Sequence, residues 1–312
     1  MAEYITVDSG TTNTRVSLVK DSVIVDVLKF KVAHSDTKTR SEMLAEQLKA
    51  GIEEILLRNK KSACDISRII CCGMITSDIG LIKLDHIPSP CGLYELSQNL
   101  YETQIKEISS IPFVFVRGVK EISGDHIDMM RGEETEIYGI NEQPEANSMY
   151  VLPGSHSKLI CIDEEHRISH FSTALTGEMI SAIACGTILK NVINLNQSAD
   201  DNEYLQKGYI FSKEHGISEA LFKVRSLKMF LNCNESQVFS FYIGAILAPE
   251  IDGIIKSAAT KIFVGGKAEL KDPTVTLLRL NSDKNVQTIS AEIAENATAY
   301  GCIRIYEKSF GN

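Results

Sequence analysis

Two short polar loops carry the residues of this sequence that could hold a chain of phosphates. The first is Asp8-Ser-Gly-Thr-Thr-Asn13, which follows the strand-like run Tyr4–Val7, and the second is Leu152-Pro-Gly-Ser-His-Ser-Lys158. A glycine after a strand lets a ligand approach the backbone, and the amides and hydroxyls beyond it can surround phosphate oxygens. The predicted phosphate contacts are Gly10, Thr11, Thr12 and Asn13 in the first loop and Gly154, Ser155 and His156 in the second.

Asp8 adds a carboxylate to the first loop, where it would repel phosphates if it acted alone. A Mg²⁺ ion between the acid and the phosphates would remove this repulsion, since Mg²⁺ binds through one or two carboxylates together with substrate phosphates. The sequence therefore predicts a metal role for Asp8. The structural alternative is an ordinary turn in which Asp8 caps its own backbone, because Asp-Ser-Gly is common turn chemistry.

The two loops belong to a longer similarity at an offset of 144 positions. This offset aligns Gly10 with Gly154, Thr11 with Ser155, and the strand-like run Val16–Val19 with Ile160–Asp163. Each loop is followed by a strand, so both halves begin with strand, polar loop and strand. The recurrence of turn residues together with possible phosphate ligands favours an internal duplication.

The elements around the loops predict an α/β architecture. Apolar residues at helical spacing indicate helices over Ser41–Asn59 and about Leu93–Ile108, and these alternate with β-branched or aromatic runs. The predicted strands are Tyr4–Val7, Arg15–Val19, Val23–Phe30, Arg68–Cys72, Phe113–Val116, Ile160–Asp163, Arg167–Ala174 and Lys261–Val264. Strands that alternate with helices are typical of layered folds with a buried sheet.

Composition narrows the classes of function. The 312 residues carry 41 acidic and 32 basic side chains, a formal charge of −9, so we expect no binding to the backbone of nucleic acids. The eight cysteines form no metal-binding spacing and are expected to be buried thiols. Glu3 and the polar loop at Ser9 interrupt any signal-like apolar stretch, so we expect a cytoplasmic protein that does not enter a membrane.

Four further stretches sharpen the interpretation of the loops. They are CGMITSDIG at Cys72–Gly80, DMMRGEETEIYG at Asp128–Gly139, LPGSHSK at Leu152–Lys158 and FSTALTGE at Phe171–Glu178. Together with the Asp8 loop they resemble the 2-dehydro-3-deoxygalactonokinase family, within the superfamily of actin, sugar kinases and heat-shock ATPases. The resemblance spans about residues 4–305, and its one departure is Ser9, where the family usually has Trp.

The resemblance implies a fold, an activity and a set of ligands. The fold would be a duplicated actin-like, ribonuclease H-like ATPase fold of two lobes with ATP in the cleft between them. The activity would be transfer of phosphate from ATP, with Mg²⁺, to the 6-hydroxyl of a 2-keto-3-deoxy sugar acid. The N-terminal lobe would cover 1–145 and be rejoined by a C-terminal helix at 291–308, and the C-terminal lobe would cover 146–290.

Phosphoryl transfer also requires a base and positive charge near the transferred group. Asp128 is the predicted base because related sugar kinases place an Asp at a helix start in this part of the chain, and Glu134 is the alternative base or a substrate contact. Lys158 could bring its charge to the phosphoryl group or extend along a strand edge to solvent. The structural alternative for Asp128 is a helix N-cap.

The substrate's carboxylate and the nucleotide's adenosine need their own contacts. A guanidinium pairs best with a carboxylate, so Arg15 and Arg131 are the candidates, although Arg131 could instead neutralise the acids beside it. Gly265-Gly266, directly after the strand Lys261–Val264, could let adenosine lie against the backbone. A simple strand-terminal turn would explain this Gly pair equally well.

Two other functions fit the same loops. A non-catalytic ATP-binding regulator would need the phosphate loops but no base, and an ATPase would use the base to orient water. The motifs do not encode which sugar acid is bound, because the placement of single donors and acceptors distinguishes epimeric hydroxyls. A homodimer is compatible with the sequence, which does not fix the number of copies.

Overall fold

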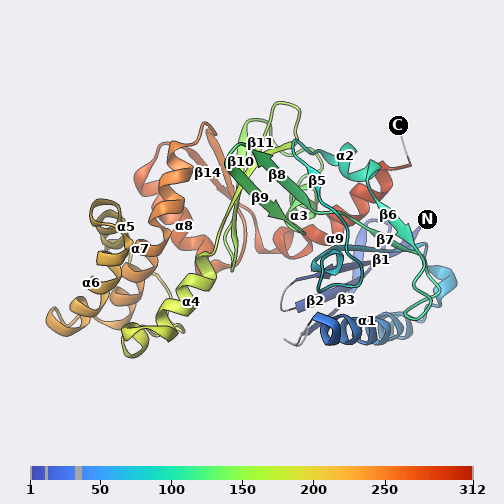
Figure 1. Cartoon of the computed structure of the whole chain (residues 1–312), viewed down its shortest axis with the longest axis horizontal. Helices are drawn as coiled ribbons and strands as arrows, with labels where there is room; N and C mark the ends of the chain where they lie inside the picture. Colours follow the sequence, from blue (N-terminus) through green and yellow to red (C-terminus); the bar gives the residue numbers. More distant parts are fainter. Residues whose placement is uncertain (1, 11–12, 32–36, 311–312) are drawn as a thin grey trace. The chain divides into compact units, whose positions relative to one another are not determined.

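The computed structural model describes residues 2–10, 13–31 and 37–310, and in these parts the chain divides into two units (Figure 1). The first unit contains 1–146, 163–170 and 292–312, and the second contains 147–162 and 171–291. The sequence-based division had assigned all of 146–290 to one lobe. The difference is the segment Asp163–His170, which clusters with the first unit.

The main sheet of the first unit has the order β3-β2-β1-β4-β7-β6. Its core strand β1 pairs antiparallel with β2 and parallel with β4, so the strand that leads into the first loop lies in the middle of the sheet. The predicted turn at Asp21-Ser22 joins β2 to β3, and both residues have positive φ. The strands are β1 Glu3–Ser9, β2 Asn13–Lys20, β3 Val23–Lys31, β4 Arg68–Gly73, β6 Tyr101–Thr103 and β7 Phe113–Phe115.

Helix α1, Thr37–Arg58, covers this sheet because Leu44, Leu48, Ile52 and Ile55 recur at helical spacing and pack into one buried cluster with the strands. A second, small sheet of order β5-β8-β9 leads into helix α3. The remaining elements of the unit are η1 Ala63–Asp65, η2 Met74–Thr76, β5 Ile87–Pro88, α2 Leu93–Gln98, β8 Val119–Ser123, β9 His126–Met130, α3 Glu133–Ile140 and α9 Ala291–Lys308.

The second unit has a sheet of order β12-β11-β10-β13-β14 with helices packed around an apolar core. As in the first unit, the strand that enters the polar loop, β10, pairs antiparallel with the strand after the loop and parallel with a later strand. Its strands are β10 Ser148–Leu152, β11 Ser157–Ile162, β12 Ile168–Ala174, β13 Lys261–Val264 and β14 Asn285–Thr288. Its helices are α4 Thr176–Gly186, η3 Ile188–Asn191, α5 Asn202–His215, α6 Ile217–Phe230, α7 Glu235–Lys256 and α8 Ala268–Asn281.

Helix α7 is long and apolar enough to cross a membrane by length and composition, but 72% of its most apolar window is buried in the structure. Phe241, Tyr242 and Ile246 are among the α7 side chains in the core cluster of the second unit. Its length and apolar character are therefore explained by its place in that core, against α5 in particular.

The predicted duplication is visible in the strand orders. The order β3-β2-β1-β4-β7 in the first unit corresponds to β12-β11-β10-β13-β14 in the second, with the same parallel pairing of the last strands. The fold class predicted from the sequence is confirmed in this respect. Two local predictions are wrong: a helix over Leu93–Ile108, because the helix ends at Gln98 and β6 follows, and a helix start at Asp128, which lies inside strand β9.

Candidate active site

The first loop closes tightly between β1 and β2. The backbone N–H of Gly10 donates to the carbonyl of Asn13 at 2.8 Å, and the hydroxyls of the buried Ser9 and Thr14 are 3.2 Å apart. Asn13 is exposed where β2 begins. The predicted phosphate contacts Thr11 and Thr12 lie outside the described residues.

Asp8 lies at the end of β1, directly opposite Arg15 in the antiparallel pair with β2. Burial raises the pKa of this carboxyl, while the charge of Arg15 and a hydrogen bond from the Thr298 side chain lower it. Thr298 comes from α9, which packs very closely on α3: a Cβ on Gly301 would lie 1.9 Å from the carbonyl oxygen of Thr135. The glycine on α9 thus brings this helix close to the carboxylates of α3.

The start of α3 holds the second acid of the site. Glu134 is fully buried, and both of its carboxylate oxygens accept from the same backbone N–H of Gly132, at 2.9 and 2.8 Å. Thr135 Oγ1 donates to the same carboxylate at 3.0 Å. Burial and the neighbouring Glu133 raise the pKa of Glu134 to about 8, although these hydrogen bonds oppose the shift.

Glu136 is a third acid, which the sequence analysis missed. Burial, then Glu133 and then Asp8 raise its pKa to about 8, whereas Arg15 lowers it. Its spacing of three residues from Glu133 at a helix start places both side chains on one face, and this signal could have identified it. Asp8, Glu136 and Arg15 therefore interact electrostatically at one end of the sheet.

This group of acids suits a hard divalent cation. Asp8, Glu134 and Glu136 are carboxylates whose pKa values are all raised in the structure, so a bound cation would stabilise their ionised forms. Oxygen ligands of this kind are those that Mg²⁺ prefers. Among the described residues the oxygens of these three acids do not converge into a preformed metal cluster, so the metal role rests on Asp8, which is nearest to the phosphate loop in sequence.

Asp128 does not belong to this group of acids. It lies in β9 opposite Glu121 of β8, and its Oδ1 accepts from the backbone N–H of Met129 at 2.6 Å. Helix α3 begins instead at Glu133, after Gly132. The helix-start position that motivated Asp128 as the base is thus held by the Glu133–Glu134 segment.

Arg131 anchors the segment Thr76–His86 to the start of α3. Its Nη1 donates to the carbonyl and the hydroxyl of Thr76, at 2.8 and 2.7 Å, and its Nη2 donates to the Leu84 carbonyl at 2.9 Å. The His86 ring nitrogen lies 3.4 Å from Nη2. The guanidinium is thus engaged mainly by backbone and hydroxyl oxygens, and its interaction with Glu134 is electrostatic.

Arg15 differs from Arg131 in having an available donor. Its Nη1 donates to the Glu295 carbonyl of α9, while its buried Nε makes no hydrogen bond within the described part of the chain. Arg15 also influences the pKa values of Asp8 and Glu136. A guanidinium in this position can neutralise the acids and still donate to an anionic group.

The second loop is built on the start of helix α4. The N–H groups of Gly177 and Glu178 donate to the carbonyls of Gly154 and Ser155, at 3.1 and 3.3 Å. The His156 ring nitrogen Nε2 lies 2.8 Å from Glu178 Oε1, so a carboxylate rather than the backbone holds this histidine. The stretch Phe171–Glu178 thereby holds the loop Leu152–Lys158 in place, which gives a structural reason for the presence of both motifs in this sequence.

Lys158 is buried and donates from Nζ to Thr173 Oγ1 at 2.6 Å. The alternative that it extends to solvent is therefore wrong.

Glu250 of α7 lies behind the same loop. It accepts a hydrogen bond from Thr176, and burial raises its pKa to about 7, although a hydrogen bond with Ser157 lowers this pKa. Glu250 could not be predicted as a residue of the site from the sequence, because nothing in the apolar pattern of α7 marks this residue.

The Gly265-Gly266 pair follows β13 as predicted. The N–H of Gly265 donates to the Val151 carbonyl at 2.8 Å, so the pair continues the sheet contact with β10 before α8 begins at Ala268. Gly266 has a φ of +79°, and a Cβ there would lie 2.6 Å from the Pro153 carbonyl oxygen. A side chain would therefore not fit at Gly266 without a shift of the backbone.

Comparisons with known proteins agree with the motifs. The family model for 2-keto-3-deoxy-galactonokinase matches residues 8–305. A probable 2-dehydro-3-deoxygalactonokinase from Rhizobium meliloti (strain 1021) is 33% identical over 126 residues, which cover 40% of this chain and 40% of that protein. The 2-dehydro-3-deoxygalactonokinase of Escherichia coli (strain K12) is 24% identical over 255 residues, 80% of each chain.

Solved structures show the fold. A structure described as that of a "putative 2-dehydro-3-deoxygalactonokinase protein" from Sinorhizobium meliloti has a TM-score of 0.84 at 21% identity and covers 99% of this chain and 100% of its own. The xylulose kinase of Lactobacillus acidophilus has a TM-score of 0.56 at 10% identity and covers 100% of this chain and 90% of its own. The fold is thus the duplicated fold of the actin-like sugar kinases, and the chain belongs to the 2-keto-3-deoxy-galactonokinase family.

Proposed function

We propose that this protein transfers a phosphoryl group from ATP to the 6-hydroxyl of 2-dehydro-3-deoxy-D-galactonate or a close relative. The observation that carries the proposal is the buried Asp8 at the end of β1, next to the Gly10–Asn13 hydrogen bond, together with the buried Glu134 at the start of α3 in the same unit. Membership of the family supports the reaction and the class of substrate. A regulator that only binds ATP would need the phosphate loops but not a further buried carboxylate such as Glu134 that can act as a base.

In this proposal the two loops bind the phosphates of ATP. Gly10 and Asn13 supply backbone and amide donors from the first loop, and Gly154, Ser155 and His156 do so from the second, with Gly265 and Gly266 beside the adenosine. Lys158 is held by Thr173 and adds positive charge near the second loop. Asp8, with Glu136, would hold Mg²⁺, which neutralises phosphate charge when it is bound.

The proposed base is Glu134. A base must accept the proton of the acceptor hydroxyl, and the ionised form of a carboxyl with a pKa of about 8 is a stronger base than an ordinary carboxylate. Because its two oxygens share one Gly132 N–H, one oxygen can turn to an incoming hydroxyl while the other keeps that hydrogen bond. Asp128 has no comparable support from its strand position.

The proposed contact for the substrate carboxylate is Arg15. Its Nε makes no hydrogen bond in the described part of the chain, so it has no partner to lose, and its burial means that the side chain must move to donate to a sugar acid. Arg131 instead keeps the Thr76–His86 segment in place through its backbone contacts. We assign Arg131 a positioning role near the substrate, because removing it would release several carbonyl acceptors at once.

One experiment separates the three functions that fit the phosphate loops. The full chain is incubated with ATP, Mg²⁺ and a panel of 2-keto-3-deoxy sugar acids, and ADP and phosphorylated acceptor are measured together. A sugar-acid kinase produces ADP only with an accepted sugar acid, an ATPase produces ADP without one, and a regulator produces none. ADP formation independent of every acceptor would overturn the proposal, and the accepted epimer would define the substrate.

We further propose that the enzyme acts in the cytoplasm, where ATP and reduced thiols coexist, and that it needs neither nucleic acid nor membrane. The buried cysteines Cys71, Cys72, Cys91, Cys233 and Cys302 carry free thiols, which is consistent with a reducing compartment. Fractionation of the native cells, followed by detection of the chain with an antibody, would test this location. Its recovery with membranes would contradict the proposal.

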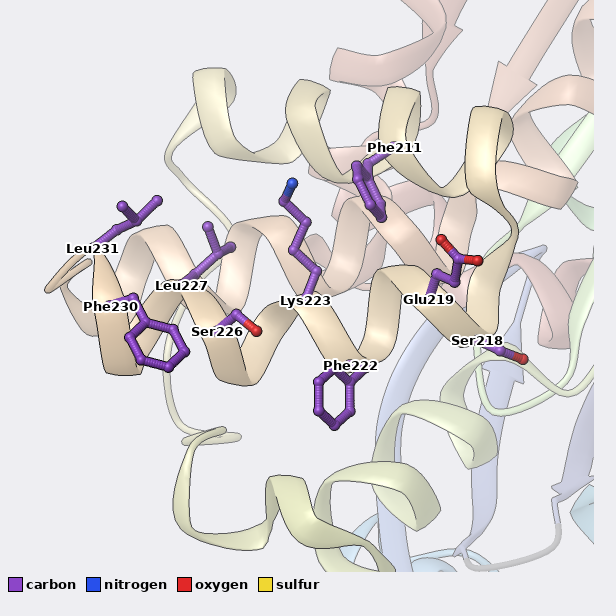
Figure 2. A pocket seen from close by; sticks show the side chains of 9 residues that line it. All are labelled: Phe211, Ser218, Glu219, Phe222, Lys223, Ser226, Leu227, Phe230 and Leu231. Carbon is purple, nitrogen blue, oxygen red and sulfur yellow. The ribbon is translucent and has the colours of Figure 1, made fainter.

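We also propose that two copies associate through helix α6. An apolar groove of about 620 Å³ runs along this helix, and Figure 2 shows Phe222 and Phe230 pointing from the same side of it, with Ser226 between them. Because these positions are spaced by four residues, a two-fold axis at the small Ser226 would place Phe222 of one copy against Phe230 of the other. The surface is thus complementary to itself.

The exposed apolar side chains would form the centre of a dimer interface. Phe222, Met229 and Phe230 each expose more than half of their surface, which amounts to roughly 350–400 Å² per copy, while Leu231 projects from another side of α6 (Figure 2). Together with a polar rim, the two copies would bury the approximately 1,200–2,000 Å² of a stable interface.

Sedimentation should therefore show a dimer. Phe222→Asp should convert this dimer to a monomer, whereas Leu57→Asp, on the exposed face of α1, should leave the dimer intact. A wild-type monomer at high concentration would refute this assembly.

A further inference from the structure

Three side chains of the first unit meet away from the phosphate loop. Glu121 of β8, His126 of β9 and His170 of β12 place one carboxylate oxygen or ring nitrogen each within 4.8 Å of one another. His170 Nδ1 lies 2.8 Å from Glu121 Oε1, and His126 Nε2 lies 3.4 Å from Glu121 Oε2. The two imidazole rings are 4.6 Å apart between centroids.

The fold brings these residues together from distant parts of the sequence. Glu121 and His126 lie on the two strands of the short β8–β9 hairpin, in which Ser123 pairs with His126 and Glu121 pairs with Asp128. His170 comes from the Asp163–His170 segment, whose Ile168 forms a bridge with Cys91. Paired residues of an antiparallel sheet project to the same side, so Asp128 lies on the face that carries Glu121 and His126.

The distances suit a single transition-metal ion. A zinc ion binds imidazole nitrogen at about 2.0–2.1 Å and carboxylate oxygen at about 2.0–2.2 Å, so two ligands of a tetrahedral site lie roughly 3.3 Å apart. The observed separations of 2.8 and 3.4 Å from the Glu121 oxygens lie on either side of this value. Small side-chain rotations would bring all three ligand atoms to one ion.

We propose that Glu121, His126 and His170 form a zinc site, with Asp128 or a water as the fourth ligand. Two imidazoles and one carboxylate are ligands that zinc and its neighbours in the first transition row prefer, whereas Mg²⁺ prefers oxygen alone. The ion would join the tip of the β8–β9 hairpin to the Asp163–His170 segment. This site is separate from the proposed base and does not depend on the proposed reaction.

The alternative is a cluster of ion pairs without metal, in which Glu121 serves two histidines. The burial of Glu121, which is 8% exposed, suits either arrangement. Zinc binding distinguishes the metal site from the cluster of ion pairs. Only a metal site binds zinc with a defined stoichiometry, and only there does the removal of one histidine lower the affinity for zinc. His170 has a side chain more than half exposed, so its replacement should not disturb folding.

The experiment is a calorimetric titration of the full chain with ZnCl₂, after treatment with a chelator and in excess Mg²⁺ to occupy the carboxylates near the phosphate loop. We expect one zinc per chain, and a loss of affinity of at least about tenfold in His126→Ala and in His170→Ala. His215→Ala, which removes an exposed histidine of α5, is the matched control and should bind as the wild type does.

A second measurement uses CoCl₂ as a coloured probe of the same site. The wild-type chain should develop visible absorption bands that disappear in His170→Ala and weaken in Asp128→Asn if that carboxylate is the fourth ligand. Circular dichroism verifies that each variant is folded, and Glu121→Gln supplies a variant of unchanged volume. Equal zinc affinity in the wild type and both histidine variants, or no zinc binding by the wild type, would overturn the proposal.

Discussion

Gly73 and Gly266 occupy equivalent positions in the two units. A Cβ on Gly73 would lie 2.5 Å from the carbonyl oxygen of Ser9, and a Cβ on Gly266 would lie 2.6 Å from that of Pro153. Both glycines have positive φ, at +82° and +79°. Ser9 and Pro153 are themselves 144 positions apart. The duplication therefore preserves the close approach of a later strand end to each phosphate loop.

Gly73→Ala should disturb the first loop, because the new methyl group meets a backbone carbonyl and an L residue resists this φ. We expect a loss of about 1–3 kcal/mol in unfolding free energy and weaker ATP binding. Urea unfolding and calorimetry with ATP would measure both. Gly253→Ala in α7, where a Cβ meets nothing within 4 Å, is the control and should leave both unchanged or raise stability. Wild-type behaviour of Gly73→Ala would contradict this account.

Much of the fold could be predicted from the sequence because its local signals agree. The β-branched runs Arg68–Cys72 and Lys261–Val264 correspond to β4 and β13, and the helical spacing in Ser41–Asn59 corresponds to α1. The offset of 144 residues also corresponds to the repeated strand order. In these regions the hydrophobic period, the turn glycines and the tertiary packing all favour the same structure.

The candidate site was harder to predict, because its acids are brought together by tertiary structure. Asp128 is of a residue type that often caps helices, yet its pairing with Glu121 places it in a hairpin. Glu250 stands in an apolar helix, and only the packing of α7 behind the second loop brings it to Thr176. The interaction of Asp8 with Thr298 likewise joins residues 290 positions apart, which no local pattern encodes.

Asp8→Asn tests the proposed metal contact. The change removes a charge and little volume, so the fold should persist while the Mg²⁺ concentration needed for half-maximal turnover rises at least about tenfold. Steady-state rates at several Mg²⁺ concentrations, with ATP in excess, would measure this shift. Asp21→Asn, at the exposed turn between β2 and β3, is the control for a lost negative charge. An unchanged Mg²⁺ dependence in Asp8→Asn would remove the metal role of this residue.

Glu250 should make stability depend on pH. Its folded pKa of about 7 exceeds its ordinary value of 4.5, so between these values the folded chain binds more protons than the unfolded chain. The contribution of Glu250 to the free energy of unfolding therefore falls as pH rises from 4.5 to 7, by at most about 1.4 kcal/mol per pH unit. Outside that window the contribution is constant. Glu250→Gln should flatten the pH dependence of the urea midpoint, and parallel curves for wild type and variant would contradict it.

Glu134→Gln tests the proposed base. The amide keeps the shape of the carboxyl but cannot accept a proton, so ATP binding should persist while turnover falls by about 10²–10⁴-fold. Because the base works when ionised, wild-type kcat/KM should rise with pH through the pKa of about 8, and the residual rate of the variant should lack this rise.

The matched variant for this test is Asp128→Asn, which removes a carboxylate of the same segment that lies in β9. With Glu134 as the base, Asp128→Asn retains turnover within a few-fold of the wild type and keeps the rise near pH 8, since it leaves the Gly132 contacts untouched. Calorimetric titration with ATP separates lost binding from lost chemistry in both variants. If Asp128→Asn loses turnover while Glu134→Gln keeps it, the proton acceptor is Asp128, and the raised pKa of Glu134 reflects only its burial at the start of α3.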